Sequence, residues 1–235
     1  MTRITELPPS ARRTLIAVLL AGSACVAAAL TGAGGWTGQD LMALAGLALA
    51  GAVLEQFLLP MRHGTERQFF SVTDAVWMAG LLLARPSVLI VAVAVGVAAG
   101  QAARRVAPHK VAFNVAQYAL SIAVAEGIFR AGHPLGVESR SWMLGIVAMA
   151  AYFAVNAGTV ALMIATVVRR PFLQVLTEPL RLTVVQWGGN MAVGVLGALV
   201  WSNQHLAVLL VMVPLAALHV AYRSYAHTRG LPLAA

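Results

Sequence analysis

The chain has 235 residues, of which 60% are hydrophobic and only 10% are charged, and its mean hydropathy is +0.82. Soluble domains carry roughly 25% charged residues, so this composition excludes an ordinary soluble domain and predicts an all-α integral membrane protein, a polytopic helical bundle. The net charge of +8 does not indicate nucleic-acid binding, because no basic run with interleaved aromatic residues accompanies it. The single cysteine, Cys25, excludes a disulfide framework and a thiol metal cluster.

Eight apolar segments, each bounded by charged residues, glycine or proline, follow one another along the chain. A chain of this length has room for about eight helices of roughly 20 residues. The segments are 15–30, 41–59, 72–84, 88–103, 111–131, 142–168, 182–201 and 206–222. They predict a single transmembrane domain over residues 15–224, with short cytoplasmic segments at residues 1–14 and 225–235.

The third and fourth segments are short for a hydrocarbon layer about 30 Å thick. They form either two short spans or one re-entrant hairpin, with Arg85 and Pro86 at the turn between them. A re-entrant hairpin would bury Arg85 in the membrane at a cost of about 2.5–3.5 kcal/mol or more, whereas two spans would place it in water. This cost favours two spans.

Positive charge is distributed unevenly between alternate loops of the eight-span arrangement. Of the 16 Lys and Arg residues, 13 fall on the side of the N-terminus, and only Arg85, Arg130 and Arg140 fall on the other side. The positive-inside rule therefore predicts that both termini are cytoplasmic; we expect the membrane to be the inner membrane of a bacterium. Arg12 and Arg13, followed by an apolar stretch, also fit a signal peptide; we expect this segment to be retained as a span.

Two further patterns concern helix packing. Pro171 and Pro179 bracket residues 172–177, which we interpret as a short interfacial helix between the sixth and seventh spans. Small residues spaced three or four apart allow close contact between membrane helices. Gly96 with Gly100, and Gly194 with Gly197, have this spacing.

Three carboxylates lie inside the predicted membrane segments. Glu55 lies near the cytoplasmic end of the second segment, Asp74 near the cytoplasmic start of the third, and Glu126 about one turn from the outer end of the fifth. On these boundaries none of them is at the midplane. Ionisable groups inside a membrane are costly, and each is therefore a candidate functional residue.

Each carboxylate also has a structural interpretation. Ser71 and Asp74 have the spacing of a capping box at a helix start. Glu55 can extend along the helix toward Arg62, and Glu126 can pair with the arginine four residues later. Both interpretations, functional and structural, remain open at this point.

Uncharged polar residues recur at helical spacing in three segments. Asn114 and Gln117 share one face of the fifth segment, Gln186 and Asn190 share one face of the seventh, and Asn156 lies in the middle of the sixth. In lipid such groups must face one another or a cavity. They either line one polar pocket or join helices by hydrogen bonds worth about 0.6 kcal/mol each. The residues predicted to contact a ligand are Glu55, Asp74, Asn114, Gln117, Tyr118, Asn156, Gln186 and Asn190.

Motifs of several enzyme classes are missing from the sequence. There is no Gly-x-Ser-x-Gly, no His-Glu-x-x-His, no P-loop and no Asp-x-x-x-Asp. His219 is the one histidine inside a segment, and it has no second ligand at a metal-binding spacing. We therefore expect no enzymatic activity, no catalytic residue, no metal and no cofactor.

Three stretches carry a family resemblance: Phe70–Val76 (FSVTDAV), Lys110–Ser121 (KVAFNVAQYALS) and Ala151–Asn156 (AYFAVN). Together they resemble the multi-span membrane-associated sensor modules at the N-terminus of bacterial HD-GYP phosphodiesterases, diguanylate cyclases and histidine kinases, over roughly residues 40–225. The resemblance implies a membrane module that senses a signal and passes it to a cytoplasmic output domain. This chain departs from that pattern, because only about a dozen residues follow its last segment. No ligand residues can be transferred from the family.

We therefore expect a stand-alone sensory or regulatory membrane module that binds a small or lipophilic ligand and acts through a cytoplasmic or membrane signalling partner. The alternatives are a small solute-transport component, similar to the substrate-binding subunits of energy-coupling-factor transporters, and a structural or assembly subunit. The expected surroundings are the lipid bilayer, a small-molecule ligand and a partner protein, without nucleic acid.

Overall fold

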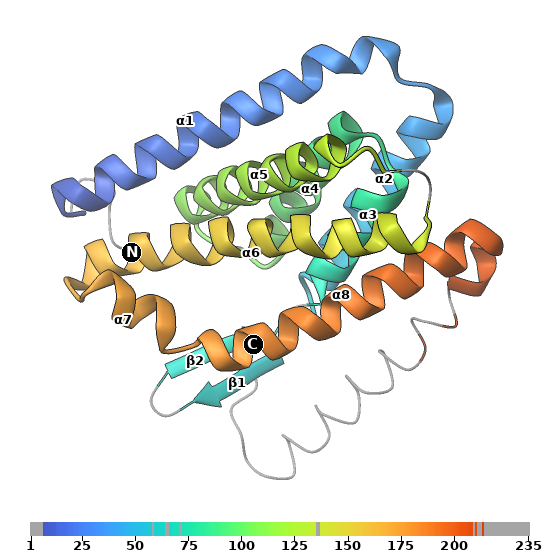
Figure 1. The fold of residues 1–235 in the computed structure, drawn as a ribbon. Helices are drawn as coiled ribbons and strands as arrows, with labels where there is room; N and C mark the ends of the chain where they lie inside the picture. Colours follow the sequence, from blue (N-terminus) through green and yellow to red (C-terminus); the bar gives the residue numbers. More distant parts are fainter. Residues whose placement is uncertain are drawn as a thin grey trace.

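The computed structural model describes residues 7–57, 59–63, 66–70, 72–134, 137–208, 210 and 213. This part of the chain is a bundle of helices (Figure 1), and five of them are long and apolar enough to cross a membrane. The prediction of a helical, multi-pass membrane architecture is confirmed at this level. Most of the eighth predicted segment, 206–222, lies outside the described residues.

The helices follow the predicted segments with small shifts. Proline stands at the first position of α1, α4 and α5, where its missing N–H costs no helical hydrogen bond. In chain order the elements are α1 (Pro9–Thr31), η2 (Gly32–Gly35), α2 (Gly38–Leu54), β1 (Leu59–His63), β2 (Glu66–Phe70), α3 (Thr73–Leu83), α4 (Pro86–Ala103), α5 (Pro108–Ala131), α6 (Ser139–Val168), α7 (Phe172–Thr177), α8 (Leu180–Asn203) and η3 (His205–Ala207). The predicted short helix at residues 172–177 is present as α7.

The connection between α2 and α3 differs from the prediction. The second segment was expected to continue to residue 59, but α2 ends at Leu54, and residues 59–70 contain the antiparallel strands β1 and β2, with Leu59 opposite Phe70. Pro60 has no backbone N–H and disfavours a helical conformation at the residue before it, so a helix could not continue through residue 59. The chain is therefore helical apart from this one hairpin among the described residues.

Successive helices run in opposite directions between two ends of the bundle. Arg85, at the turn between α3 and α4, donates a hydrogen bond to the carbonyl oxygen of Gly35, in the connection between α1 and α2. Arg130, near the end of α5, donates to the carbonyl oxygen of Ala84. These three turns therefore lie together, and we call this end the Arg85 end. The opposite end, where α1 and α5 begin and α2, α4 and α6 end, is called the basic end.

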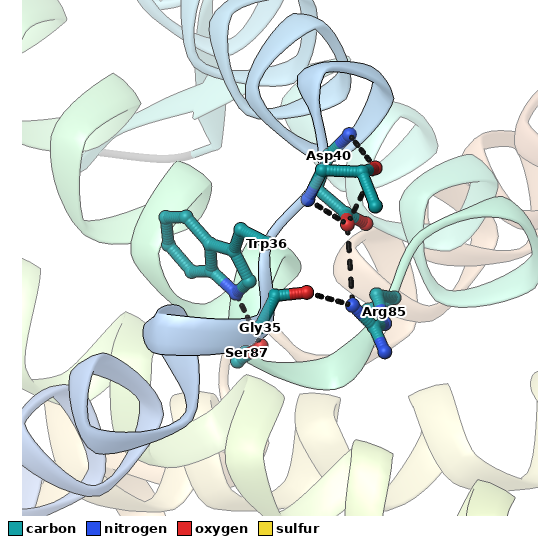
Figure 2. A network of polar contacts seen from close by, with 6 residues as sticks. Gly35, Trp36, Asp40, Arg85 and Ser87 are labelled. Carbon is teal, nitrogen blue, oxygen red and sulfur yellow. Dashed lines mark hydrogen bonds and ion pairs between the residues drawn. The ribbon is translucent and has the colours of Figure 1, made fainter.

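A polar network holds the Arg85 end together (Figure 2). The indole N–H of Trp36 donates to Ser87 Oγ at 2.9 Å, and Arg85 Nη1 lies 3.2 Å from Asp40 Oδ2 and 2.9 Å from the Gly35 oxygen. The Arg85 side chain is 57% exposed. The turn after α3 thus reaches the same level as the end of α1.

The hydrophobic core is centred on α3 and α4. Trp77, Met78 and Leu81 of α3, with Leu89 and Val93 of α4, are completely buried. Around them α1, α2, α5, α6 and α8 supply further contacts, and α1 and α8 pack on opposite sides of the bundle (Figure 1). The short helix α3 is therefore enclosed by protein.

Glycines allow α4 to approach α2 closely, as predicted. A Cβ at Gly96 would lie 2.9 Å from the carbonyl oxygen of Ala48, and one at Gly100 would lie 2.6 Å from the Glu55 Cβ. Both distances are too short for a methyl group. Any side chain at these two positions would push the helices apart.

In the second predicted glycine pair, Gly194 and Gly197, only one glycine makes a close helix contact. A Cβ at Gly194 would lie 2.6 Å from the carbonyl oxygen of Ala75, so this glycine allows contact between α8 and α3. Nothing lies within 4 Å of a Cβ at Gly197, which faces away from that contact. The spacing identified the close approach but not which glycine makes it.

This pair provides a matched test of packing. We expect Gly194→Ala to lower the free energy of unfolding by about 1–3 kcal/mol, because the methyl group overpacks the contact with α3. Gly197→Ala should be neutral or stabilising by up to about 1 kcal/mol, since alanine is the better helix former. Unfolding of both variants in detergent micelles measures the difference. Equal effects would contradict the close approach of α8 to α3.

Candidate functional site

Asp74 lies in the first turn of α3 and contacts two other helices. The Tyr152 hydroxyl, from α6, donates to Asp74 Oδ1 at 2.9 Å, and the side chain of Asn190, from α8, also hydrogen-bonds to the carboxylate. The residue that precedes α3 is Val72, whose side chain makes no hydrogen bond to the helix end, and Ser71 of the predicted capping box lies outside the described residues. Asp74 is tied to two neighbouring helices.

The depth of Asp74 also differs from the prediction. With 11 residues, α3 is only about 16 Å long, whereas the 23 residues of α1 extend about 34 Å. Because α3 ends at the Arg85 end, its first turn lies about halfway along the bundle. Tyr152 and Asn190 likewise lie near the middle of α6 and α8. An ionisable side chain near the middle of the bundle is the strongest functional signal in this structure.

Two further side chains complete this group. The rings of Tyr118, from α5, and Tyr152 have centroids 6.3 Å apart. The side chain of Asn156, one turn after Tyr152 on α6, hydrogen-bonds to both tyrosines. We call Asp74, Tyr118, Tyr152, Asn156 and Asn190 the Asp74 cluster. It joins four helices that are distant in sequence.

A second polar group lies nearer the basic end. Glu55, which caps the end of α2 and is 3% exposed, forms an ion pair with Arg104 (3.4 Å). Gln101 hydrogen-bonds to Glu55 and accepts a hydrogen bond from the Asn114 amide at 2.8 Å. We call Glu55, Gln101, Arg104 and Asn114 the Glu55 cluster. Glu55 thus has Arg104 as an ion-pair partner; the predicted partner, Arg62, has its side chain outside the described part of the structure.

The two clusters are neighbours. Asn114 of the Glu55 cluster and Tyr118 of the Asp74 cluster are one turn apart on the same helix, α5. The charge of Asp74 acts on Glu55, and both carboxylates act on Tyr118. The carboxylates of the two clusters are therefore close enough for their charges to interact.

The remaining polar residues lie around these groups or apart from them. Gln117 is 2% exposed, and its Oε1 has no hydrogen-bond partner among the described residues. Gln186 lies one turn nearer the basic end of α8 than Asn190. Glu126 pairs with Arg130 at 3.1 Å, which confirms the predicted i,i+4 pair and places Glu126 toward the Arg85 end.

Sequence reasoning missed Tyr152 as a site residue. A tyrosine in a membrane segment is common as an interfacial or core residue, so its type alone gives no warning. Its spacing carries a signal, because Tyr152 and Asn156 are four apart and share one helix face. The acceptor, Asp74, is 78 residues away from Tyr152 in the sequence. Which residue accepts this hydrogen bond therefore depends on tertiary packing.

The Asp74 cluster has a defined chemical character. Its carboxylate accepts hydrogen bonds, and its tyrosine and asparagine side chains can both donate and accept. None of the Lys and Arg side chains in the described part of the chain forms an ion pair with Asp74. The cluster is thus suited to a small group that donates hydrogen bonds or carries positive charge.

No protein-family model, curated protein or solved structure matches the chain.

The hydrogen bond between Tyr152 and Asp74 can be measured directly. We expect Tyr152→Phe and Asp74→Ala to destabilise the protein non-additively, with a coupling energy of about 0.6–1.7 kcal/mol, the range for hydrogen bonds between membrane helices. The double-mutant cycle is built from unfolding free energies in micelles. A parallel cycle of Tyr152→Phe with Glu126→Ala should be additive, since Glu126 lies two turns beyond Tyr118 on α5. Additivity in both cycles would contradict the bond.

Proposed function

We propose that this chain is a multi-pass membrane module that binds a small ligand at the Asp74 cluster and passes the signal to a partner protein. The observation that carries the proposal is a carboxylate halfway along an apolar bundle, surrounded by neutral hydrogen-bonding side chains from three other helices. A charged side chain at the centre of a membrane helix costs about 2.5–3.5 kcal/mol on insertion scales. A ligand that pairs with Asp74 would recover this cost.

The ligand that fits this environment carries a protonated amine or several hydrogen-bond donors. Asp74 provides the negative charge, and the rings of Tyr118 and Tyr152 provide faces that attract cations. Asn156 and Asn190 would orient a polar substituent. The resemblance of this region to bacterial sensor modules is in keeping with recognition of a small molecule.

Transmission would use the contacts between the two clusters. A ligand that takes the place of Tyr152 at Asp74 would change the contacts that join α3, α6 and α8. Tyr118 and Asn114 on α5 extend from there to the Glu55–Arg104 ion pair at the basic end. A ligand shifts such an equilibrium only by its difference in affinity for the two arrangements. The partner would respond to the new arrangement at the basic end.

We infer that the basic end faces the cytoplasm, because the positive charge of the described helix ends is concentrated there.

Cysteine labelling tests this orientation. In a Cys25→Ala background, a cysteine introduced by Gly34→Cys should react with a membrane-impermeant maleimide added outside intact cells. Gly34 is exposed in the connection after α1, with open space around it. A cysteine introduced by Gln174→Cys, at an exposed position of α7, should react only after the cells are opened. The reverse labelling pattern would show that the protein has the opposite orientation in the membrane.

Ligand binding is tested by native mass spectrometry of the protein extracted gently from its own membrane. We expect wild type to retain a small molecule at a ratio of one to one, and Asp74→Asn to retain at least tenfold less, because the negative charge is removed. Glu126→Gln is the matched control, since it removes a buried carboxylate away from the Asp74 cluster, and it should retain the molecule.

The other outcomes decide between functions. A co-isolated signalling protein supports the sensory module, whereas a retained solute that the protein moves across vesicles would indicate a transport component. Equal retention in wild type and Asp74→Asn would remove the Asp74 cluster as the binding site. A protein that retains nothing and loses only stability in Asp74→Asn would indicate a structural subunit.

A further inference from the structure

Five basic side chains at the basic end are exposed and form no ion pair with any acidic residue that the structure describes. They are Arg12, Arg13, Arg105, Lys110 and Arg169, which we call the basic rim. Two neighbouring arginines behave differently, since Arg104 pairs with Glu55, and Arg170 pairs with Glu178. The basic rim thus holds positive charge that these acidic residues do not neutralise.

Packing brings three members of the basic rim, Arg12, Lys110 and Arg169, together from three helices. Leu15 of α1 and Phe113 of α5 belong to one buried cluster, against which Met163 of α6 packs. Arg12 and Lys110 each lie about one turn from this cluster toward the basic end, and Arg169 lies about 9 Å further along α6 than Met163. The start of α1 and the end of α6 accordingly lie at the same end of the bundle (Figure 1).

Two members of the basic rim occupy backbone positions that glycine normally fills. Arg105 and Arg169 have φ angles of 55° and 56°, in the left-handed region just after α4 and α6. A residue other than glycine costs about 1–3 kcal/mol in such sparsely populated regions, and helix ends of this kind usually carry glycine. Arginine at both positions places charge at the helix ends despite this cost.

Exposed apolar side chains continue directly from the basic rim. On α1 they are Ile16 and Leu20, and on α6 they are Val167 and Val168. Positive charge at a helix end, followed by an apolar surface along the same helix, matches the shape of a phospholipid with a negative headgroup. Basic sites between membrane helices bind such headgroups.

We propose that the basic rim is a binding site for an anionic phospholipid, with the headgroup phosphate between α1, α5 and α6 and the acyl chains along the exposed faces of α1 and α6. Arg12 and Lys110 contact the phosphate from the starts of two helices, Arg169 closes the site from the end of a third, and Arg13 and Arg105 add positive charge around it. The site is separate from the Asp74 cluster and does not depend on the function proposed for that cluster.

The test uses the full-length protein in a neutral detergent, with phosphatidylglycerol and phosphatidylcholine as probes. Native mass spectrometry should show phosphatidylglycerol bound at least tenfold more tightly. Arg12→Gln with Arg13→Gln, and separately Lys110→Gln with Arg169→Gln, should each remove most of this preference, since each surface charge contributes roughly fivefold. Arg140→Gln, an exposed arginine at the start of α6 near the Arg85 end, should leave it unchanged.

Two controls keep the outcome decisive. Arg12→Lys with Arg13→Lys retains the charge and should retain the preference, which separates loss of binding from misfolding. Inorganic phosphate is added at equal concentration, because it shares the phosphate chemistry. If phosphate competes as well as phosphatidylglycerol, the site binds free anions and the lipid proposal fails. Equal binding of the two lipids, or an unchanged preference in both double variants, would also overturn it.

Discussion

The carboxylate of Asp74 is the constraint on which the rest of the structure depends. It lies about halfway along an apolar bundle and is partly buried there, so partners from the protein stabilise it. Tyr152 and Asn190 meet that requirement from α6 and α8. Because both donors have to reach one carboxylate, the three helices can pack in only a narrow range of registers.

Close packing makes that arrangement possible. Trp77, one turn from Asp74, is completely buried against α2 and α4, and its ring comes within contact distance of Gly51 and Gly96. On the other side of α3, Gly194 lets the backbone of α8 approach that of α3. Between membrane helices such contacts replace the hydrophobic effect as the attractive force, because lipid is as apolar as the side chains. Small residues and one large indole thus place Asn190 within reach of Asp74.

The two ends of the bundle differ in chemistry. At the Arg85 end, Arg85 and Arg130 are used in the structure itself, since each donates a hydrogen bond to a backbone carbonyl of another turn. At the basic end, Arg104 and Arg170 are paired, but the basic rim remains open to other molecules. Both proposed interactions, with a cytoplasmic partner and with an anionic phospholipid, therefore use the end with surplus positive charge. The polar connection from Asp74 through α5 leads to this same end.

The sequence alone was sufficient for features that depend on local or one-dimensional properties. Apolar length predicted the long helices, prolines predicted α7, and i,i+4 spacing predicted the pair of Glu126 with Arg130. It failed for the end of α2 and the hairpin that follows. There a long apolar run is compatible with more than one backbone path, and composition does not choose among them.

The candidate site also has features that could be predicted from the sequence and features that could not. Residue type marked Asp74, Asn156 and Asn190 as expensive in a membrane, because the cost of a polar group in lipid belongs to the side chain itself. Only the tertiary structure decided that Asp74 bonds to Tyr152, that Glu55 pairs with Arg104, and that α3 begins halfway along the bundle. Those outcomes depend on which helix faces meet and at what depth, and that is a property of the packed bundle as a whole.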